Sequence, residues 1–373
     1  MSDFEPRPRR NQTPEERLAG GHGLSPQKTG PHDCLYVFFD LTCTAIDFGV
    51  AEFLILSIEA AKQRGLEQVH IVYVPAANDS YRIHGTPDRI GDEWRVQNIL
   101  MQIPWLSPLT CGVTWCTTRE QAEMLRAAVG PHVFPENYSV QDEADGYLSC
   151  HASRDVIRHH QGQDLRHLRA TDSSLFYMRR WLDRFVGQRK AVVITLRESS
   201  HNPERNSDIA AWVAFAKSLD ETVYCPVFMR DTDVFFGGES SPRSQDEDYL
   251  RAHKQALVDV QDFPSCDEAS SNLHARCALY ELSYANLAVP SGPVSMCVYN
   301  RKPRYISFRI TVDKAYSTSM DYLHWIGIEK DKSFPFGGAT QKLVWEEDTF
   351  EVISREFKVL VKQIERKKEE NDG

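Results

Sequence analysis

The 373-residue sequence lacks the features that define several large protein classes. Its nine cysteines contain no CxxC pair, and the lone Cys111–Cys116 spacing is poor support for a zinc site or a disulfide framework. No apolar run reaches the roughly 18 to 20 residues that span a bilayer, and residues 1–23 lack the apolar core of a secretory signal. These absences favour a cytoplasmic protein with reduced, mostly buried thiols and no transmembrane segment.

Positive charge is also scarce. The chain has 43 Lys and Arg against 53 Asp and Glu, a net charge of −10, whereas a general nucleic-acid binder needs a surplus of cations to displace counterions. The spacings GxGxxG, GxxxxGK(S/T), HExxH and GxSxG are missing too, which weakens the case for dehydrogenases, P-loop NTPases, zinc proteases and α/β-hydrolases. We therefore predict neither a nucleic-acid partner nor a cofactor.

The sequence does contain a repeated alternation of strand and helix patterns. Residues 35–42 and 68–75 are predicted strands, and residues 47–64 between them form an apolar helix with Asp47 as a plausible N-cap and Gly65 after its end. The alternation pauses near residues 140–175 and then resumes. Two such alternations predict an α/β fold of two doubly wound, Rossmann-like domains that face a cleft. The expected division is a disordered arm (1–30), an N-terminal domain with its linker (31–172), a C-terminal domain (173–347) and a terminal helix with a tail (348–373).

The connection between the two halves is basic. Residues 151–190 carry nine Lys and Arg against four Asp, a net charge of +5, in a chain that is negative as a whole. A cationic seam near the domain junction would attract an anionic ligand. A solvated linker helix explains the same charges.

The strongest binding signal is a polar loop after the predicted strand at Lys190–Leu196, which carries Arg197, Arg205, Asn206 and Ser207 into a helix. Ligands of open α/β sheets bind at the carboxyl ends of strands, so two guanidiniums, a hydroxyl and a helix start at this edge suit a phosphate group. The alternative is that Asn206 or Ser207 only caps the helix and that Arg197 pairs with a neighbouring carboxylate.

A second candidate is the turn Ser291-Gly292-Pro293 between a short strand and a helix. Its small residues allow the backbone to approach a ligand, and Pro293 suits a first helical turn. A plain strand-to-helix turn explains the same residues equally well. Glu281, one helix earlier, is either an acceptor for ribose hydroxyls or a solvated helix residue.

With these features the C-terminal half, roughly residues 186–365, resembles the donor domain of GT-B glycosyltransferases, especially the fucosyltransferase-like and heptosyltransferase-like branches. The resemblance rests on the arginine loop (Arg197, Arg205), on Ser291-Gly292-Pro293 followed by the strand at Arg304-Tyr305-Ile306, and on the long helix from Asp348. It implies a glycosyltransferase of the hexosyltransferase type, which moves a sugar from a nucleotide-sugar donor to a cytoplasmic glycan or small-molecule acceptor, as in polysaccharide biosynthesis. The terminal helix is then expected to cross back onto the N-terminal, acceptor-side domain.

The resemblance also implies roles for single residues. Arg197, Arg205, Asn206, Ser207, Ser291 and Gly292 would bind the donor diphosphate, and Asp231 and Glu281 the nucleoside. Asp231-Thr232-Asp233 is a DxD spacing, which we interpret as a strand-end cap or nucleoside contact, so no metal is predicted. The predicted general base is Asp47, with Asp40 second, although Asp47 is also the expected helix cap.

Two other functions remain open at the level of sequence. A nucleotide-sugar epimerase or hydrolase on the same fold would need the donor pocket but no acceptor surface. A catalytically inactive GT-B-like binding protein would keep only the fold.

Overall fold

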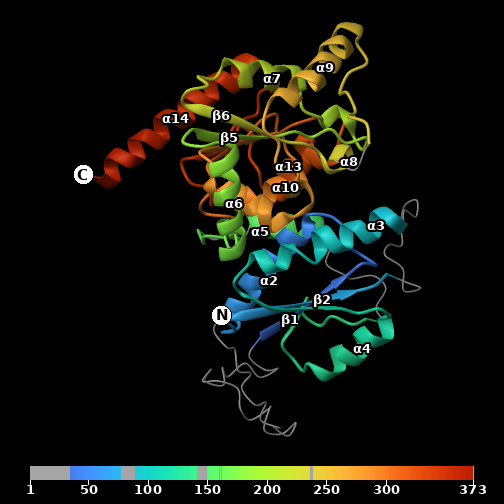
Figure 1. The fold of residues 1–373 in the computed structure, drawn as a ribbon. Helices are drawn as coiled ribbons and strands as arrows, with labels where there is room; N and C mark the ends of the chain where they lie inside the picture. Colours follow the sequence, from blue (N-terminus) through green and yellow to red (C-terminus); the bar gives the residue numbers. More distant parts are fainter. Residues whose placement is uncertain are drawn as a thin grey trace, which may run out of the picture.

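The computed structural model describes residues 34–76, 89–140, 149–158, 160, 162–235 and 238–372, so the arm expected at 1–30 lies outside the described residues. Two α/β domains lie one above the other in Figure 1, the N-terminal domain below the C-terminal domain. Each contains one sheet whose strand pairs are parallel. The predicted fold class, two doubly wound domains, is confirmed. Within the described part of the chain, no helix is long and apolar enough to cross a membrane.

The N-terminal sheet has the order β3-β2-β1-β4. Its strands are β1 (Cys34–Asp40), β2 (Gln68–Val74), β3 (Thr110–Trp115) and β4 (Val133–Phe134). Helix α2 (Gly49–Gln63) covers the face toward the C-terminal domain, and α4 (Arg119–Ala128) covers the other face (Figure 1). Between β2 and β3 the chain forms α3 (Arg89–Arg95), η2 (Val96–Leu100) and η3 (Ile103–Leu106).

The C-terminal sheet has the order β6-β5-β7-β8-β9. Its strands are β5 (Lys190–Thr195), β6 (Tyr224–Met229), β7 (Ala285–Ala288), β8 (Tyr305–Ser307) and β9 (Gln341–Leu343). The order changes direction at β5, which has β6 on one side and β7 on the other. In open parallel sheets ligands bind at such a switch point, outside the carboxyl ends of the strands.

Helices bury both faces of this second sheet. Val192 and Ile194 belong to the apolar cluster under α7 (Ile209–Ser218), α9 (Glu247–Asp259) and α14 (Phe350–Asp372). Val193 between them belongs to the cluster under α6 (Asp172–Phe185) and α11 (Leu273–Leu282). Successive residues of β5 thus face opposite helix layers. Because both layers are apolar, the strand is apolar at every position from Ala191 to Ile194. The remaining helical segments are α8 (Thr232–Phe235), α10 (Glu268–Ser271), α12 (Ser295–Val298), η4 (Pro203–Arg205), η5 (Val260–Asp262), η6 (Gly292–Val294) and η7 (Tyr316–Thr318).

The two domains are joined by packed contacts. Helix α5 (Ser149–Arg158), in the stretch expected to be a plain connection, packs on α2 of the first domain and on α13 (Met320–Ile326) of the second. Gln102 accepts a hydrogen bond from Leu273 N (2.7 Å) and donates to Ser271 O (3.3 Å). The amide of Arg169 donates to Leu106 O at 2.7 Å. These contacts position the two halves of the site described below.

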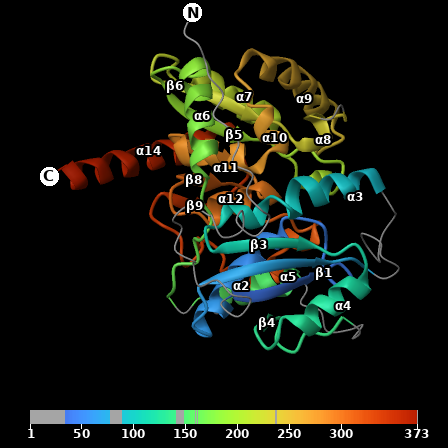
Figure 2. The ribbon, with the colours of Figure 1, turned by 60° about the horizontal axis from the view of Figure 1, so that its bottom comes forward.

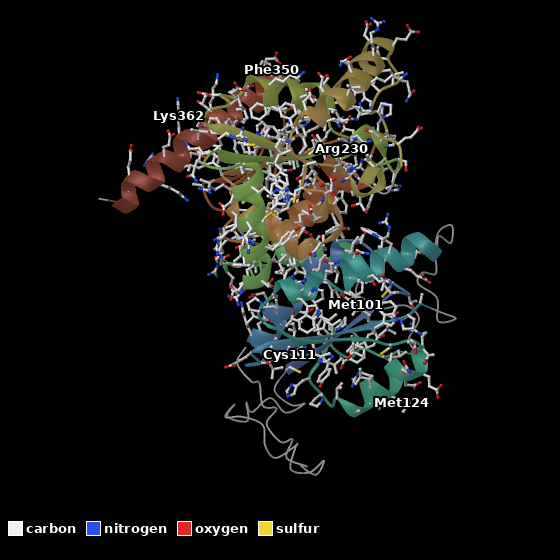
Figure 3. The ribbon with its side chains drawn as sticks, viewed as in Figure 1. Met101, Cys111, Met124, Arg230, Phe350 and Lys362 are labelled. Carbon is white, nitrogen blue, oxygen red and sulfur yellow. The ribbon has the colours of Figure 1, made fainter. Side chains whose placement is uncertain are left out.

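The terminal helix α14 does not cross back to the N-terminal domain, so that expectation was wrong. Phe357 packs edge-on against Phe215 and Tyr224, with ring centroids 5.3 and 5.4 Å apart. The predicted apolar stripe is therefore buried against its own domain. The turns after Ile364 are charged, and the end of the helix projects away from both domains (Figures 1 and 2). Phe350 and Lys362, labelled in Figure 3, lie far from the labelled N-terminal residues.

Candidate active site

A cavity of about 1070 Å³ lies between the domains, at the carboxyl ends of the C-terminal strands. Its volume is at the upper end of the range for small-molecule and cofactor sites. The N-terminal domain contributes the start of α2 and part of α3, and the C-terminal domain contributes the loops after β5, β6, β7 and β8. Its polar or charged lining includes Asp47, Glu52, Arg197, Arg205, Arg230, Asp231, Arg276, Ser291 and Ser295.

The loop after β5 is held together by its own side chains. Arg197 donates through Nη1 to Asn202 O (2.9 Å) and to Asn206 Oδ1, and through Nη2 to His201 O. The Asn206 amide donates to Ser199 O (2.9 Å) and Ser241 O (2.7 Å). Ser207 Oγ accepts from the amide of Arg197 at 3.0 Å.

This bonding changes the interpretation of three predicted diphosphate ligands. Asn206 and Ser207 are buried and do not line the cavity. Neither caps the following helix, because Asp208 is its N-cap. Arg197 does line the cavity, but its guanidinium fixes the shape of the loop. We infer that these residues build the wall of the cavity.

Arg205 has spare donor capacity in the same loop. Its Nη1 donates to Ser317 Oγ at 3.0 Å and its Nη2 to Pro290 O at 3.3 Å, while its buried Nε has no hydrogen-bond partner. No described carboxylate forms an ion pair with it. Burial and then the charge of nearby Arg197 lower the pKa of Arg205 to about 10. An anion in the cavity would satisfy the spare donor and offset the repulsion between the two cations.

The turn after β7 presents two further unsatisfied groups. Ser291 and Ser295 line the cavity, and their Oγ atoms are buried and have no hydrogen-bond partner. Gly292 lies between them, and a Cβ at this position would come within 2.2 Å of Cδ2 of Phe48. The missing Cβ therefore allows Phe48 of the N-terminal domain to pack closely against this turn.

Arg276 is a cavity residue that the sequence reasoning missed. It is only 2% exposed, and its Nε donates to Ala269 O at 2.7 Å. No residue in the described ranges forms an ion pair with it. Burial, and then the charge of Cys277, raise the pKa of the Cys297 thiol, which lies two residues after Ser295; the charge of nearby Arg276 opposes this rise. Arg205 and Arg276 thus place two cations near the Ser291–Ser295 turn.

Two carboxylates face this turn from the N-terminal domain. Asp47 Oδ1 accepts from the amide of Gly49 at 2.8 Å, just before α2, whose N-cap is Phe48 and not the predicted Asp47. Glu52, one turn further, lines the cavity and interacts electrostatically with Tyr299 of the C-terminal domain. Burial, with a smaller contribution from the charge of Asp47, raises the pKa of Glu52 to about 7. Glu52 was also missed by the sequence reasoning.

Asp40, the second candidate for general base, has a structural role. Its carboxylate accepts from Arg119 Nη1 (2.9 Å) and Nη2 (3.1 Å), from Tyr138 Oη (2.5 Å) and from the amide of Thr42 (2.9 Å). It lies outside the cavity lining. We therefore remove it from the candidates for acid–base chemistry.

The two predicted nucleoside contacts have different positions. Asp231 lines the cavity at the end of β6, where its Oδ2 accepts from the amide of Glu198 at 3.2 Å. Glu281 does not reach the cavity. Its carboxylate accepts from the amide of Ala170 (2.6 Å), from Asn300 Nδ2 (2.9 Å) and from Lys302 Nζ (2.8 Å). It anchors the interdomain segment, which corrects its expected role.

The basic stretch at 151–190 does not supply the cations of the cavity. Of its described residues only Ser153 and Ile157 line the cavity. Arg158 donates to His324 O, Arg166 bonds Asp164, and Arg179 and Arg180 are exposed on α6. Most of these charges therefore serve domain contacts or a solvated helix face.

Comparison with known proteins gives likenesses of fold only. No family model and no curated protein sequence matches the chain. Among solved structures, E. coli ADP-heptose LPS heptosyltransferase II matches with a TM-score of 0.48 and 10% identity over 89% of this chain and 99% of that one. A glycosyl transferase family 9 protein from Veillonella parvula matches with a TM-score of 0.44 and 10% identity over 74% of this chain and 80% of that one. The GT-B domain of a Photobacterium damselae sialyltransferase matches with a TM-score of 0.30 and 10% identity over 84% of this chain and 100% of that one. No residue role is transferred from these likenesses.

Proposed function

We propose that the protein is a metal-independent glycosyltransferase, which moves a sugar from a nucleotide-sugar donor to a cytoplasmic glycan or small-molecule acceptor. One observation carries the proposal. Arg205, Ser291 and Ser295 of the C-terminal domain, whose buried Nε and Oγ atoms have no hydrogen-bond partner, line the same cavity as Asp47 and Glu52 of the N-terminal domain. The first set suits a diphosphate, and the second suits an acceptor hydroxyl that must lose its proton.

The donor would lie along the carboxyl ends of the strands. The diphosphate is placed between Arg205, Arg276 and the two serine hydroxyls, where the cations offset its charge. Asp231, at the end of β6, is the proposed nucleoside contact. Arg197 keeps a supporting role, because its guanidinium holds the loop that carries Arg205.

The transfer step needs a base and a stabilised leaving group. As the acceptor oxygen bonds to the anomeric carbon, the bond from that carbon to the diphosphate oxygen breaks. The acceptor proton passes to the Glu52 carboxylate, whose pKa near 7 suits a base at neutral pH. The negative charge left on the diphosphate is met by Arg205 and Arg276. Asp47 raises the pKa of Glu52 through its own charge and is the second candidate for the base.

The test is incubation with a panel of UDP, GDP, ADP and CMP sugars in the presence of EDTA. Transfer, or slow release of free sugar and nucleotide that Glu52→Gln abolishes, is the expected result. Activity that EDTA abolishes and Mn²⁺ restores would contradict the metal-independent step. An epimerised donor would favour an epimerase, and no thermal shift with any nucleotide would favour an inactive binding protein.

A further inference from the structure

Tyr316 is the most exposed large apolar side chain in the described part of the chain. It is 76% exposed, in the short helix η7, and it lines the mouth of the cavity. An aromatic ring left in water at the entrance of a site has surface available for a ligand.

Tyr316 begins a row of aromatic rings that runs from the cavity to the packed contact between α13 and α5. Its ring centroid lies 5.2 Å from that of Tyr322, which lies 5.9 Å from that of Trp325 on the same helix α13. Beyond Trp325 follow the His151 ring at 5.8 Å and the Arg154 guanidinium at 5.3 Å, both from α5. Tyr316 and Tyr322 line the cavity, and Trp325 continues the row outside it.

The row lies on the side of the cavity opposite the proposed nucleoside contact. Asp231 follows β6, at one edge of the sheet, whereas Tyr316 and Tyr322 follow β8, on the other side of the switch point. Ser317, next to Tyr316, accepts the hydrogen bond from Arg205. Burial raises the pKa of Tyr299, and Glu52 and Tyr322 both lie close enough to add to this rise. The row thus begins beside the proposed diphosphate site and the proposed base.

We propose that Tyr316 and Tyr322, with Trp325 packed behind them, form the acceptor subsite and that its occupant is a chain of two or more sugars. This inference rests on the proposed function. The C–H faces of sugar rings stack on aromatic rings, while tyrosine hydroxyls and the indole N–H can bond the sugar hydroxyls. Tyr322 within the cavity and the exposed Tyr316 at its mouth place two rings in succession, which suits an acceptor longer than the single sugar that receives the bond.

The test is calorimetric titration with linear oligosaccharides of two to six sugars and, separately, with UDP, GDP, ADP and CMP. We expect affinity for the best oligosaccharide to rise with chain length and to fall about tenfold in Tyr316→Ala. Tyr316→Phe keeps most of the affinity because it keeps the ring. The control is Phe176→Ala, which removes a 62% exposed ring on α6 and changes neither titration.

The outcomes separate the two claims. Nucleotide binding without binding of any oligosaccharide overturns the acceptor subsite and leaves the proposed function standing. A loss of nucleotide affinity in Tyr316→Ala also overturns it, because the ring would then hold the nucleobase. Absence of nucleotide binding in the wild type contradicts the proposed function itself.

Discussion

The loop after β5 and the turn after β7 look alike in sequence and differ in structure. Both follow a buried strand, both contain serine beside polar or small residues, and both lead into a helix. In the first, Arg197, Asn206 and Ser207 bond one another and the loop backbone. In the second, Ser291 Oγ and Ser295 Oγ are buried without partners.

The difference shows which kind of polar group is available to a ligand. A buried polar group costs free energy unless it is hydrogen-bonded, so a folded chain leaves few of them unsatisfied. Groups bonded within the loop stabilise the fold, and groups left unsatisfied around a cavity are placed for a ligand. Arg205 belongs to the second kind, although it is part of the first loop.

The largest expected effect on folding comes from Asn206→Ala. The change removes the hydrogen bond between the Arg197 guanidinium and Asn206 Oδ1 and the two that the Asn206 side chain donates to the carbonyls of Ser199 and Ser241, so the free energy of unfolding should fall by about 3 kcal/mol. Urea denaturation measures it, with the exposed Gln188→Ala as a control that should change little. Wild-type stability of Asn206→Ala would contradict the structural role assigned to the loop.

Arg205→Ala should weaken nucleotide binding with little effect on folding, whereas Asn206→Ala should mainly weaken folding. Nucleoside diphosphate affinity should fall by about 2 kcal/mol, the range of a charge-assisted hydrogen bond. The free energy of unfolding should change by less than about 1 kcal/mol, because a cation with a lowered pKa gains little from its present site. Arg205→Lys keeps the charge but not the planar guanidinium, so its nucleotide affinity should lie between that of the wild type and that of Arg205→Ala. Equal affinity in all three proteins would remove Arg205 from the site.

Glu52, which faces the turn across the cavity, should make stability depend on pH. Its folded pKa of about 7 lies above the ordinary value, so its contribution is full in acid and is lost as the pH rises through 7. As the pH rises from 5 to 8, the free energy of unfolding of the wild type should therefore fall by about 2 kcal/mol relative to that of Glu52→Gln. Parallel pH profiles for the two proteins would contradict this assignment.

The smallest expected effect is that of Ser291→Ala with Ser295→Ala. Because neither hydroxyl has a partner in the folded chain, the unliganded double variant should match or exceed wild-type stability by up to about 1 kcal/mol. The thermal shift caused by a nucleoside diphosphate should shrink. A clear loss of stability without ligand would show that these hydroxyls are satisfied in the folded protein.

The sequence predicted the fold well because its signals are local. The alternation of apolar runs marked the buried strands. Helix α5 and strand β9 were missed, since a polar helix and a three-residue strand leave weak patterns. The predicted packing of α14 on the N-terminal domain was wrong, because an apolar helix face does not show which domain will cover it.

The site was predicted only in part, because hydrogen-bond partners depend on tertiary structure. The sequence indicated both loops that line the cavity. It could not show that the Asn206 side chain is hydrogen-bonded within its loop whereas Ser291 Oγ has no partner. Glu52 and Arg276 did have a usable signal. Each is a charged residue with apolar neighbours on both sides, Ala51 and Phe53 around Glu52 and Ala275 and Cys277 around Arg276, an arrangement that predicts a buried ionisable group.

The most direct test of the account is calorimetric titration of the wild type, Arg205→Ala and Arg276→Ala with UDP, GDP, ADP and CMP in EDTA. The surface variant Arg251→Ala serves as the control. We predict that at least one nucleotide binds without metal, that both cavity variants lose about tenfold or more in affinity, and that the control keeps wild-type affinity. Binding that requires a divalent cation, or that neither cavity variant weakens, would contradict the assignment of the cavity as a diphosphate site.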